Sequence, residues 1–392
     1  EYASENGTVS TDGFRYVSFE KGKYLTGQIV LLSNVCLWIG KDVEILGSLN
    51  PKDYPDDPSL WRLIYANDKN KIGIRGYGTV NGQAVPGMIE YYSSIDDRYQ
   101  PFTWNINGCV GECRPRQVQF INCSNILVQG VTLSNSPDWT SHYQGCENVI
   151  IDNVTVQGDL RWPNNDGIDI DSSRNVLVQR CNVSTGDDGV CLKASSEEYG
   201  DALNVTVRYC RIRSKSSAIK FGSSFNANYK NIIFHDIDIW DSNRGIGIQV
   251  RGPGNMTNVT YANMTIETRM NAHRWWGDGE PIWITAIQRY KGDMIGKVSN
   301  ITFKNITTKS ENGAMLSGVT TSLDMIKFSN VHINIDKWTS NWTHPSRDYR
   351  PSWQYPEEVK SNTNGIYLEY INNISFENTI VTFNENDKQP YW

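Results

Sequence analysis

The chain has 392 residues, of which 39% are hydrophobic and 20% are charged, and its formal net charge is -6. The acidic balance provides no basic surface for nucleic acid, so nucleic acid is not an expected partner. No apolar run approaches the length of about 18 residues that a membrane span requires, so a membrane is not an expected partner either. No Pro-rich, Gly/Ser-rich or single-charge tract interrupts the chain, and we expect residues 1–392 to form one domain.

A recurring Asn followed by alternating aliphatic residues marks the chain from Asn125 onward, and each copy leads into a second short apolar strand. Further copies begin at Asn148, Asn175, Asn204, Asn231, Asn258, Asn300 and Asn373. The first five steps run from 23 to 29 residues, while longer steps leave room for loops at 267–298 and 336–365. Repeats of this length that contain only strands indicate a solenoid. We therefore predict an all-β, right-handed parallel β-helix with inserted loops, in which residues 1–60 form the opening coils.

Superimposing successive repeats places similar residues in vertical rows, because side chains along a strand alternate between two faces. The inward rows are apolar: one contains Ile168, Val190, Ile219 and Ile246, and the next contains Ile170, Leu192, Phe221 and Ile248. The outward rows are Asp169, Cys191, Lys220 and Gly247, then Asp171, Lys193, Gly222 and Gln249. A row at the strand entrance contains Asp166, Asp188, Ser217 and Arg244. The alignment predicts a polar groove across several coils, with acids at its centre and cations toward one side.

Three acidic residues fall together in this groove. Asp166 lies in Asn164-Asn165-Asp166-Gly167, and Asp187 and Asp188 follow about one coil later in Gly186-Asp187-Asp188-Gly189. Hydrolysis of a glycosidic bond uses two carboxyl groups, one to protonate the leaving oxygen and one to deliver water. Adjacent acids also repel, so the pKa of one should rise and supply the protonated partner. Asp and Gly are equally typical of turns, and it is the repeat that favours the catalytic interpretation.

These residues resemble the family 28 glycoside hydrolases, which include polygalacturonases and rhamnogalacturonan hydrolases. The resemblance covers most of the chain, through Gly22-Lys-Tyr-Leu-Thr-Gly-Gln, Gly76-Tyr-Gly-Thr-Val-Asn-Gly, Arg114-Pro115 and Asn135-Ser-Pro-Asp-Trp139. Asn164-Asn165-Asp166 is similar to the family's Asn-Thr-Asp element, and Gly186-Asp187-Asp188 to its paired-Asp element. The resemblance implies that Asp187 is the general acid and that Asp166 and Asp188 hold and activate the water. It also implies inversion at the anomeric carbon, with carboxyl groups about 6.5 to 9.5 Å apart.

Two elements of the family are missing. Its Gly-His-Gly element falls on Ser216-Ser217-Ala218, and the Arg-Ile-Lys element that clamps the galacturonate carboxylate in polygalacturonases falls on Gly247-Ile248-Gln249. Arg and Lys are the natural partners of a sugar carboxylate, whereas Gly and Gln carry no charge. Plain homogalacturonan is therefore not the expected substrate. A neutral sugar fits this pattern, and so does an acidic sugar held from another side by the cations Arg244, Lys193, Lys220 or Arg251.

Aromatic residues near the groove are candidates for stacking on sugar rings, and a nearby acid can bind sugar hydroxyls. The segment His273-Arg-Trp-Trp-Gly-Asp-Gly-Glu-Pro281 fills the first long loop, where its paired Trp residues could equally pin the loop to the solenoid. Trp162 immediately precedes the first acid motif. The residues that we predict to bind substrate are Asn165, Lys193, Ser217, Lys220, Arg244, Gln249, Arg251, Trp162, Trp275, Trp276 and Glu280.

Four of the eight cysteines stand at equivalent positions of neighbouring repeats. Cys123 pairs with Cys146 in this alignment, and Cys181 with Cys210. A strand spacing of about 4.8 Å lies within the Cα range of a disulfide, so both pairs are disulfide candidates. Cys109 and Cys113 could close a small loop. The alternative is that the cysteines are reduced core residues.

Several Asn-X-Ser/Thr sites coincide with the repeat, where Asn is expected at a coil corner and is a poor glycan acceptor. Asn6, Asn255 and Asn341 are the better candidates for glycosylation. A polysaccharide substrate lies outside cells, where cysteines are also oxidised. We therefore expect a secreted, extracellular protein, or a periplasmic one if the source is bacterial.

Two other functions stay open, because fold does not fix function. A β-helix polysaccharide lyase would use an Arg or Lys base, or calcium, which the three acids could bind. A non-catalytic carbohydrate-binding solenoid would use the same groove without hydrolysis. We rank the hydrolase first because all three acids are retained. It needs no cofactor and no metal, and we expect a monomer whose partner is a polysaccharide or oligosaccharide.

Overall fold

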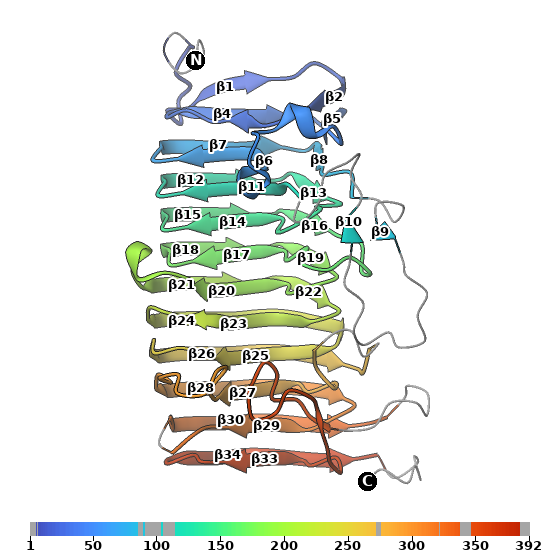
Figure 1. Ribbon diagram of the computed structural model, residues 1–392, viewed down its shortest axis with the longest axis vertical. Coiled ribbons are helices and arrows are strands. Elements are labelled where there is room, and N and C mark those ends of the chain that lie inside the picture. Colours follow the sequence, from blue (N-terminus) through green and yellow to red (C-terminus); the bar gives the residue numbers. More distant parts are fainter. Residues whose placement is uncertain are drawn as a thin grey trace.

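The computed structural model describes residues 7–84, 114–271, 276–320, 322–337 and 346–384, together with Glu5 and two short strands at 89–90 and 103–104. Its strands stack as successive coils of a right-handed parallel β-helix, which runs from the blue N-terminal coils to the red C-terminal coils in Figure 1. The predicted fold class is therefore confirmed. Within the described part of the chain, no helix has the length and apolar character needed to cross a membrane.

Two long parallel sheets form the walls of the solenoid. The larger has 19 strands, namely β1 (Arg15–Ser18), β2 (Gly22–Thr26), β4 (Val35–Ile39), β5 (Val43–Gly47), β7 (Asn70–Gly76), β8 (Thr79–Asn81), β12 (Ser124–Gln129), β13 (Thr132–Ser134), β15 (Glu147–Asp152), β16 (Thr155–Gln157), β18 (Arg174–Gln179), β19 (Asn182–Thr185), β21 (Ala202–Arg208), β22 (Arg211–Ser214), β24 (Tyr229–Ser242), β26 (Met256–Thr268), β28 (Val298–Ser310), β30 (Leu323–Ile335) and β34 (Ile374–Phe383).

The other sheet has 11 strands, namely β3 (Ile29–Val30), β6 (Arg62–Asn67), β11 (Arg116–Ile121), β14 (Ser141–Gln144), β17 (Ile168–Asp171), β20 (Val190–Ala194), β23 (Ser217–Phe225), β25 (Arg244–Val250), β27 (Ile282–Ala286), β29 (Ala314–Ser317) and β33 (Ile366–Glu369). Two antiparallel pairs lie outside the sheets, β9 (Ile89–Glu90) with β10 (Thr103–Trp104) and β31 (Ser346–Arg347) with β32 (Val359–Lys360). Short 3₁₀ turns occur at η1 (Pro51–Asp53), η2 (Pro58–Leu60) and η4 (Glu197–Tyr199).

The register of the 11-stranded sheet agrees with the predicted apolar rows. The vertically paired residues are Ile168, Val190, Ile219 and Ile246 in one row and Ile170, Leu192, Phe221 and Ile248 in the next, and all of them are buried in the core. Burial of one such side chain is worth about 1.5–3 kcal/mol. A slip of one residue would turn the whole set outward, so the apolar pattern fixes which side chains face the groove.

The register of the 11-stranded sheet shifts in β23. Leu192 of β20 pairs with Phe221, but Ala194 pairs with Phe225, so β23 contains two more residues than β20 over the same span. The predicted row that joins Lys193 to Gly222 is therefore not formed. A bulge of this kind redirects side chains, and the residues at 222–224 line the pocket described below.

The repeat asparagines lie at coil corners, as predicted. Asn125 and Asn148 both have φ of 56°, in the left-handed region that Asn tolerates. From Asn125 to Asn300, Nδ2 of each repeat asparagine donates to Oδ1 of the asparagine one coil earlier, for example from Asn148 to Asn125 at 3.3 Å. Of the three candidate glycan acceptors, Asn6 and Asn341 lie outside the described residues.

The cysteines correct one prediction. Cys123, Cys146, Cys181 and Cys210 are all buried free thiols, so neither expected disulfide is present. Stacked parallel strands hold Cβ atoms at a spacing of about 4.8 Å with parallel directions, whereas a disulfide needs about 3.5–4.5 Å. The thiols instead donate to main-chain carbonyls, as Cys123 does to Ile121 at 3.1 Å. Cys109 and Cys113 lie outside the described residues.

The long loops also differ from the prediction. Residues 267–298, expected to be one loop, contain β27, which continues the 11-stranded sheet. Residues 346–360 form a loop that the pairing of β31 with β32 closes at its base. In Figure 1 this loop crosses in front of β25, β27 and β29 as an orange-red ribbon. It therefore lies on the outer face of the 11-stranded sheet.

Candidate active site

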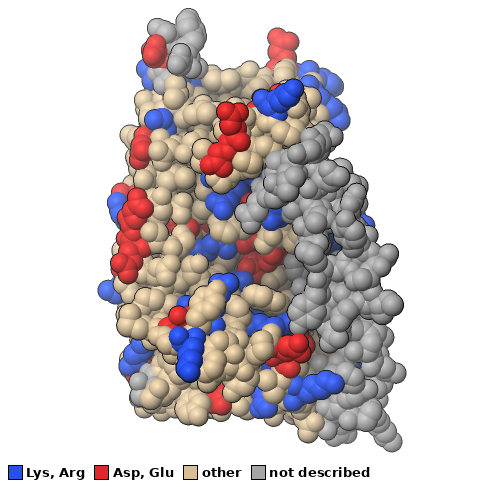
Figure 2. Space-filling view, in the orientation of Figure 1, with Lys and Arg blue, Asp and Glu red and all other residues tan. Residues whose placement is uncertain are grey.

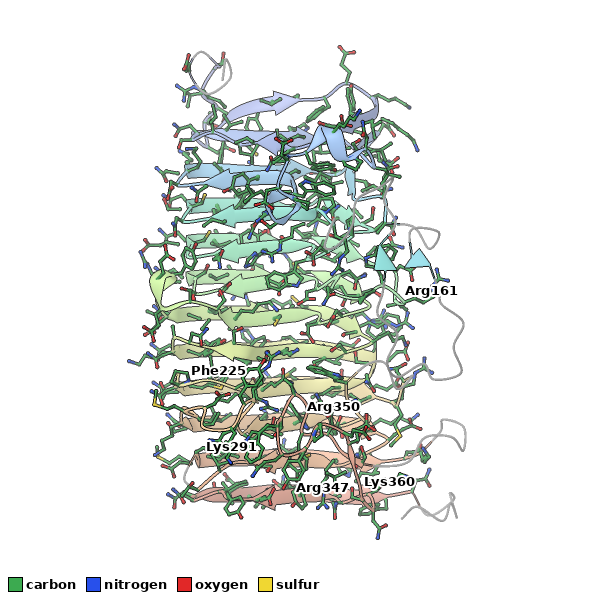
Figure 3. All side chains as sticks on the ribbon, viewed as in Figure 1. Arg161, Phe225, Lys291, Arg347, Arg350 and Lys360 are labelled. Carbon is green, nitrogen blue, oxygen red and sulfur yellow. The ribbon has the colours of Figure 1, made fainter. Side chains whose placement is uncertain are left out.

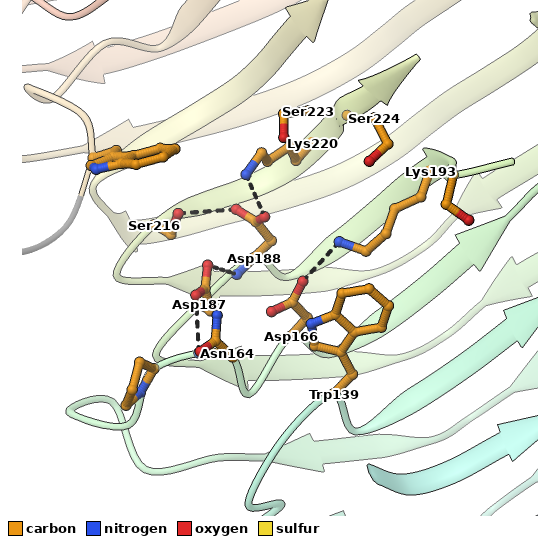
Figure 4. Close-up of a pocket in the computed structure, with 14 residues that line it drawn as sticks. Trp139, Asn164, Asp166, Asp187, Asp188, Lys193, Ser216, Lys220, Ser223 and Ser224 are labelled. Carbon is orange, nitrogen blue, oxygen red and sulfur yellow. Dashed lines mark hydrogen bonds and ion pairs between the residues drawn. The ribbon is translucent and has the colours of Figure 1, made fainter. Parts of the chain in front are cut away.

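A pocket opens on the outer face of the 11-stranded sheet, beside β17, β20 and β23 (Figure 4). Its volume is about 410 Å³, and its lining consists of Trp139, Pro163, Asn164, Asp166, Asp187, Asp188, Lys193, Ser195, Ser216, Lys220, Gly222, Ser223, Ser224 and Trp276. Figure 2 shows acidic and basic side chains together in a hollow near the middle of this face. The pocket lies where the sequence predicts the polar groove.

The three predicted catalytic acids meet in this pocket. Asp166 lies two residues before β17, and Asp188 lies two residues before β20. Asp187 directly precedes Asp188, in the short connection between β19 and β20. The main-chain N–H groups of Asn164 and Asp188 each donate to the carboxylate of Asp187, at 3.0 Å in both cases. Asp166 and Asp188 are almost fully buried, and Asp187 is partly exposed. Stacking of coils thus brings together residues that are more than 20 positions apart in the chain.

The electrostatic environment singles out Asp187. Burial raises the pKa of its carboxyl group to about 7, and the neighbouring charges of Asp166 and Asp188 add to this effect. The ammonium group of Lys220 and the hydrogen bond from Asn164 act in the opposite direction but are weaker. A carboxyl group with a pKa near 7 is still substantially protonated at neutral pH, so Asp187 can donate a proton there.

The other two acids are each bound by a lysine. Nζ of Lys193 lies 3.0 Å from Asp166 and 3.1 Å from Asp169, while Nζ of Lys220 lies 2.8 Å from Asp188. Burial opposes charge on Lys193, but the attraction of Asp169, reinforced by Asp166, outweighs it and raises its pKa well above the usual range. These ion pairs hold the carboxylates of Asp166, Asp169 and Asp188 in place beside the pocket.

Among the described residues, one group of three side chains has the spacing to hold a metal ion, but a lysine already contacts all three of its ligand atoms. Asp166, Asp169 and Cys191 offer atoms within 4.8 Å of one another, but Nζ of Lys193 lies against all three, at 3.0 Å, 3.1 Å and 3.3 Å. The lysine ammonium group takes the position in which a metal ion would have to bind. The lyase alternative assigns calcium to Asp166, Asp187 and Asp188, a different set of side chains from this cluster.

Several of the residues that we predict to bind substrate are buried and do not line the pocket. Trp162 is 1% exposed, and its ring N–H donates to the carbonyl of Pro137 at 2.8 Å, so it cannot stack on a sugar. Asn165 is fully buried, and Ser217 is 1% exposed. The hydroxyl that reaches the acids is instead that of Ser216, which donates to Asp188 at 3.0 Å.

A second group of predicted substrate contacts lies one coil further on and is covered by the loop at 346–360. Arg244 and Glu280 form an ion pair at 3.0 Å with side chains 3% and 1% exposed. The same loop buries Gln249 and Arg251, whose side chains donate hydrogen bonds to its main-chain carbonyls. None of the four lines the pocket. Of the predicted binders, Lys193, Lys220 and Trp276 do line it, while Trp275 lies outside the described residues.

Some pocket residues were not among the predicted contacts. Trp139 contacts the pocket with its ring, and Nζ of Lys193 lies 4.3 Å from the ring centroid, a cation–π contact. Asp169 lies beneath the pocket as the second carboxylate partner of Lys193. The outward position of Asp169 in the sequence rows was the available signal for its role. Trp139, in Asn135-Ser-Pro-Asp-Trp139, is from its sequence only a weaker candidate for stacking on a sugar ring, because its coil carries no acid motif.

Asn165 holds the turn that carries Asp187. Its Oδ1 accepts the main-chain N–H of Gly186 at 2.9 Å and of Asp187 at 3.0 Å, and its Nδ2 donates to the carbonyl of Asp159 at 2.9 Å. We expect Asn165→Ala to lower the free energy of unfolding by about 1–3 kcal/mol, because buried N–H groups lose their acceptor. Denaturant unfolding measures this loss. Asn182→Ala, at an exposed position of β19, is the control, and an equal loss in both variants would contradict this role for Asn165.

Comparison with known proteins agrees with this geometry. The family model described as Glycosyl hydrolases family 28 matches residues 13–348. A probable polygalacturonase of Vitis vinifera is 26% identical over 289 residues, which cover 68% of this chain and 56% of that protein. An endo-polygalacturonase of Pectobacterium carotovorum subsp. carotovorum is 25% identical, covering 75% of this chain and 73% of its own. A solved exopolygalacturonase of Thermotoga maritima has the same fold, with a TM-score of 0.72 at 22% identity over 95% of this chain and 85% of its own. The match to the family model spans most of the sequence, and the chain belongs to the glycosyl hydrolases family 28.

Proposed function

We propose that this protein hydrolyses glycosidic bonds of a pectin-like or other extracellular polysaccharide by single displacement with inversion. The observation that carries the proposal is the unequal setting of three acids in one pocket. The pKa of Asp187 is raised to about 7, whereas Asp166 and Asp188 are each bound by a lysine. Acid and base catalysis need carboxyl groups in different electrostatic environments, and the three acids of this pocket differ in that way.

In the proposed reaction, Asp187 donates its proton to the leaving glycosidic oxygen. Asp166 and Asp188 hold a water molecule on the opposite face of the sugar, and one of them accepts a proton as the water attacks the anomeric carbon. The C–O bond to the leaving sugar breaks as the bond to water forms, and the anomeric configuration inverts. Lys193 and Lys220 keep the two carboxylates oriented toward the pocket, and Ser216 fixes Asp188 from a third direction.

The sugar at the cleavage position is, in this proposal, neutral rather than a galacturonate. Both lysines that line the pocket already pair with carboxylates, and Arg244 and Arg251 are buried behind the loop at 346–360. A sugar carboxylate would therefore face three acids without a free cation among the described lining residues. Repulsion between like charges disfavours that complex.

The direct test is release of reducing ends from homogalacturonan, rhamnogalacturonan, galactan, arabinan and sulfated glycans, with Asp187→Asn as the inactive control. The proposal expects release from a substrate with a neutral sugar at the cleaved bond, and an anomeric product opposite in configuration to the substrate by NMR. Preferred cleavage of homogalacturonan would overturn the neutral-sugar part. Binding of a glycan without release of reducing ends would identify a carbohydrate-binding solenoid instead, and an unsaturated, absorbing product would identify a lyase.

The raised pKa of Asp187 also predicts the pH dependence. Because the general acid must be protonated, kcat/KM should fall as pH rises through about 7. The charge of Lys220 lowers the pKa of Asp187, so Lys220→Met should move this alkaline limb to higher pH, whatever its effect on the maximal rate. A full pH–rate profile of both enzymes makes the comparison. An alkaline limb at the same pH in both would show that Asp187 does not set it.

Trp276 is the exposed aromatic ring in the pocket lining and is proposed to stack on a sugar. We expect Trp276→Ala to raise KM by about tenfold with little change in kcat, since a stacking contact made equally in ground and transition state affects binding alone. Trp353→Ala provides a matched control, because the two rings are 38% and 42% exposed but Trp353 lies outside the pocket. A fall in kcat with unchanged KM would contradict the stacking role.

The protein is also proposed to act as a monomer outside the cell or in a periplasm, where such polysaccharides are accessible. The proposed location follows from the proposed substrate.

A further inference from the structure

The loop at 346–360, called the strap from here on, occupies the face of the sheet that carries the pocket. The pocket uses the outer face of β17, β20 and β23, and the next two strands of that sheet are β25 and β27. The strap lies over these two strands, and Figure 3 labels its residues Arg347, Arg350 and Lys360 over the lower coils. The groove that the sequence predicts across several coils is therefore covered directly beyond β23.

Hydrogen bonds from outward-facing side chains hold the strap against the sheet. Nε2 of Gln249 donates to the carbonyl of Arg350 at 2.7 Å, and Nε of Arg251 donates to the carbonyl of Pro351 at 2.7 Å. The ring N–H of Trp283 donates to the carbonyl of Asp348 at 2.9 Å. These side chains come from β27 and from β25 or directly after it, and they point outward where Lys193 and Lys220 do in the pocket. Their hydrogen-bond donors bind the strap and are therefore not available to a substrate.

Buried charges add to this attachment. Asp348 is fully buried and pairs with Arg244 of β25 at 3.3 Å and with Arg350 of the strap at 2.8 Å. Arg350 also pairs with Glu358, which ties the two arms of the strap together. Lifting the strap would break the ion pair between Arg244 and Asp348. Separating two buried charges costs free energy, because each charge loses its partner. The strap is therefore a fixed wall rather than a lid.

We infer that the strap makes the enzyme act close to a chain end, because it limits the substrate to a short stretch of sugar on one side of the catalytic acids. Asp187 and Asp188 precede β20, and the first covered strand is β25, two coils further along the sheet. Two coil spacings amount to about 10 Å. A polysaccharide that continued past the site along the sheet in this direction would meet the strap. This inference rests on the proposed hydrolysis and adds where along the polymer it occurs.

The test follows product sizes during digestion of the polysaccharide that the reducing-end screen shows to be cleaved, together with its oligosaccharides of defined length labelled at the reducing end. The inference expects one short product from the first time points, and a solution viscosity that falls slowly relative to the release of reducing ends. Which labelled fragment is short identifies the end that is bound against the strap. A ladder of intermediate sizes with an early loss of viscosity would overturn the inference while leaving the proposed hydrolysis intact. Absence of release from every glycan would instead overturn the proposed function.

A strap variant tests whether this loop is the determinant. Replacing residues 349–357 by a short Gly-Ser linker retains Asp348 for Arg244 and keeps the β31–β32 base, but removes the covering segment. We expect this variant to yield intermediate sizes that the wild type does not, while Trp353→Ala, on the exposed side of the strap, keeps the wild-type products. An unchanged single product from a folded linker variant would overturn the role of the strap. If the linker variant does not fold, the wild-type product series still decides whether the enzyme acts at a chain end.

Discussion

Asp187→Asn should reduce kcat by about 10²–10⁴-fold, the usual contribution of a general acid. The amide has the size of the carboxyl group but cannot supply its proton to the leaving oxygen. The pKa of Asp187 near 7 is the reason for choosing this residue among the three acids. Affinity for uncleaved substrate should change much less, because the carboxyl group acts on the breaking bond. Initial rates give kcat and KM, and calorimetry on the variant gives the dissociation constant.

A second substrate separates acid catalysis from general damage. A substrate with an aryl leaving group of low pKa needs no proton from the enzyme, so Asp187→Asn should lose far less activity on it than on the natural glycan. Asp238→Asn, on the exposed surface of the 19-stranded sheet and 49% exposed at its side chain, controls for the substitution itself. Equal losses on both substrates would show that Asp187 has another role. Full activity of the variant on the glycan would show that Asp187 does not take part in the reaction.

The fold was predictable from sequence because the physical constraints repeat. Each coil needs an Asn that tolerates left-handed φ and two short apolar strands, and both are visible in the amino-acid pattern. Rows such as Ile168 above Val190 can then be aligned without any structure, and the same alignment brings Asp166 to Asp187 and Asp188. The apolar core positions fix the register of the coils. Because inward and outward positions alternate along a strand, that register also predicts where the central acids lie.

The walls of the pocket were not predictable in the same way. Gln249 and Arg251 occupy outward positions and are correctly placed by the repeat, yet residues 349–351, about 100 positions later, cover them. The pattern of one coil contains no information about which distant loop packs against it. The hydroxyl that reaches Asp188 is that of Ser216 and not, as predicted, that of Ser217, and this difference has another cause. Ser216 immediately precedes β23 and Ser217 is its first residue, so the turn before the strand, rather than the strand alternation, decides which hydroxyl points into the pocket.

Lys193→Met should lower the free energy of unfolding by about 3–5 kcal/mol, the cost of removing one partner from a buried ion pair. The side chains concerned are almost completely removed from solvent: Lys193 is 10% exposed, Asp166 5% and Asp169 0%. Methionine fills much of the same volume, so the loss comes mainly from two carboxylates left facing each other in a buried site. Chemical denaturation at neutral pH measures it.

Lys215→Met is the matched control, since Lys215 is 13% exposed and pairs with Asp241 at 3.3 Å. Asp241 also pairs with Arg213 and Arg269, so it keeps cationic partners when Lys215 is removed. We expect this variant to lose no more than about 1 kcal/mol. The difference between the two lysines would show that an unpaired buried carboxylate, and not the loss of a lysine, carries the cost.

The pH dependence of the Lys193→Met variant provides a second, independent measure. Burial already raises the pKa of Asp169 above its usual value, and without Lys193 that pKa should be higher still. A carboxyl group whose pKa is higher in the folded than in the unfolded state favours folding at low pH and opposes it as pH rises through the folded value. The deficit of the variant should therefore shrink as pH is lowered toward 4, and addition of Asp169→Asn should recover part of it at neutral pH. A variant as stable as the wild type at neutral pH would mean that Asp169 is protonated in the native protein, and Lys193 would then have charge to offer a substrate carboxylate. That result would weaken the case for a neutral sugar at the cleavage position as well as the case for the ion pair.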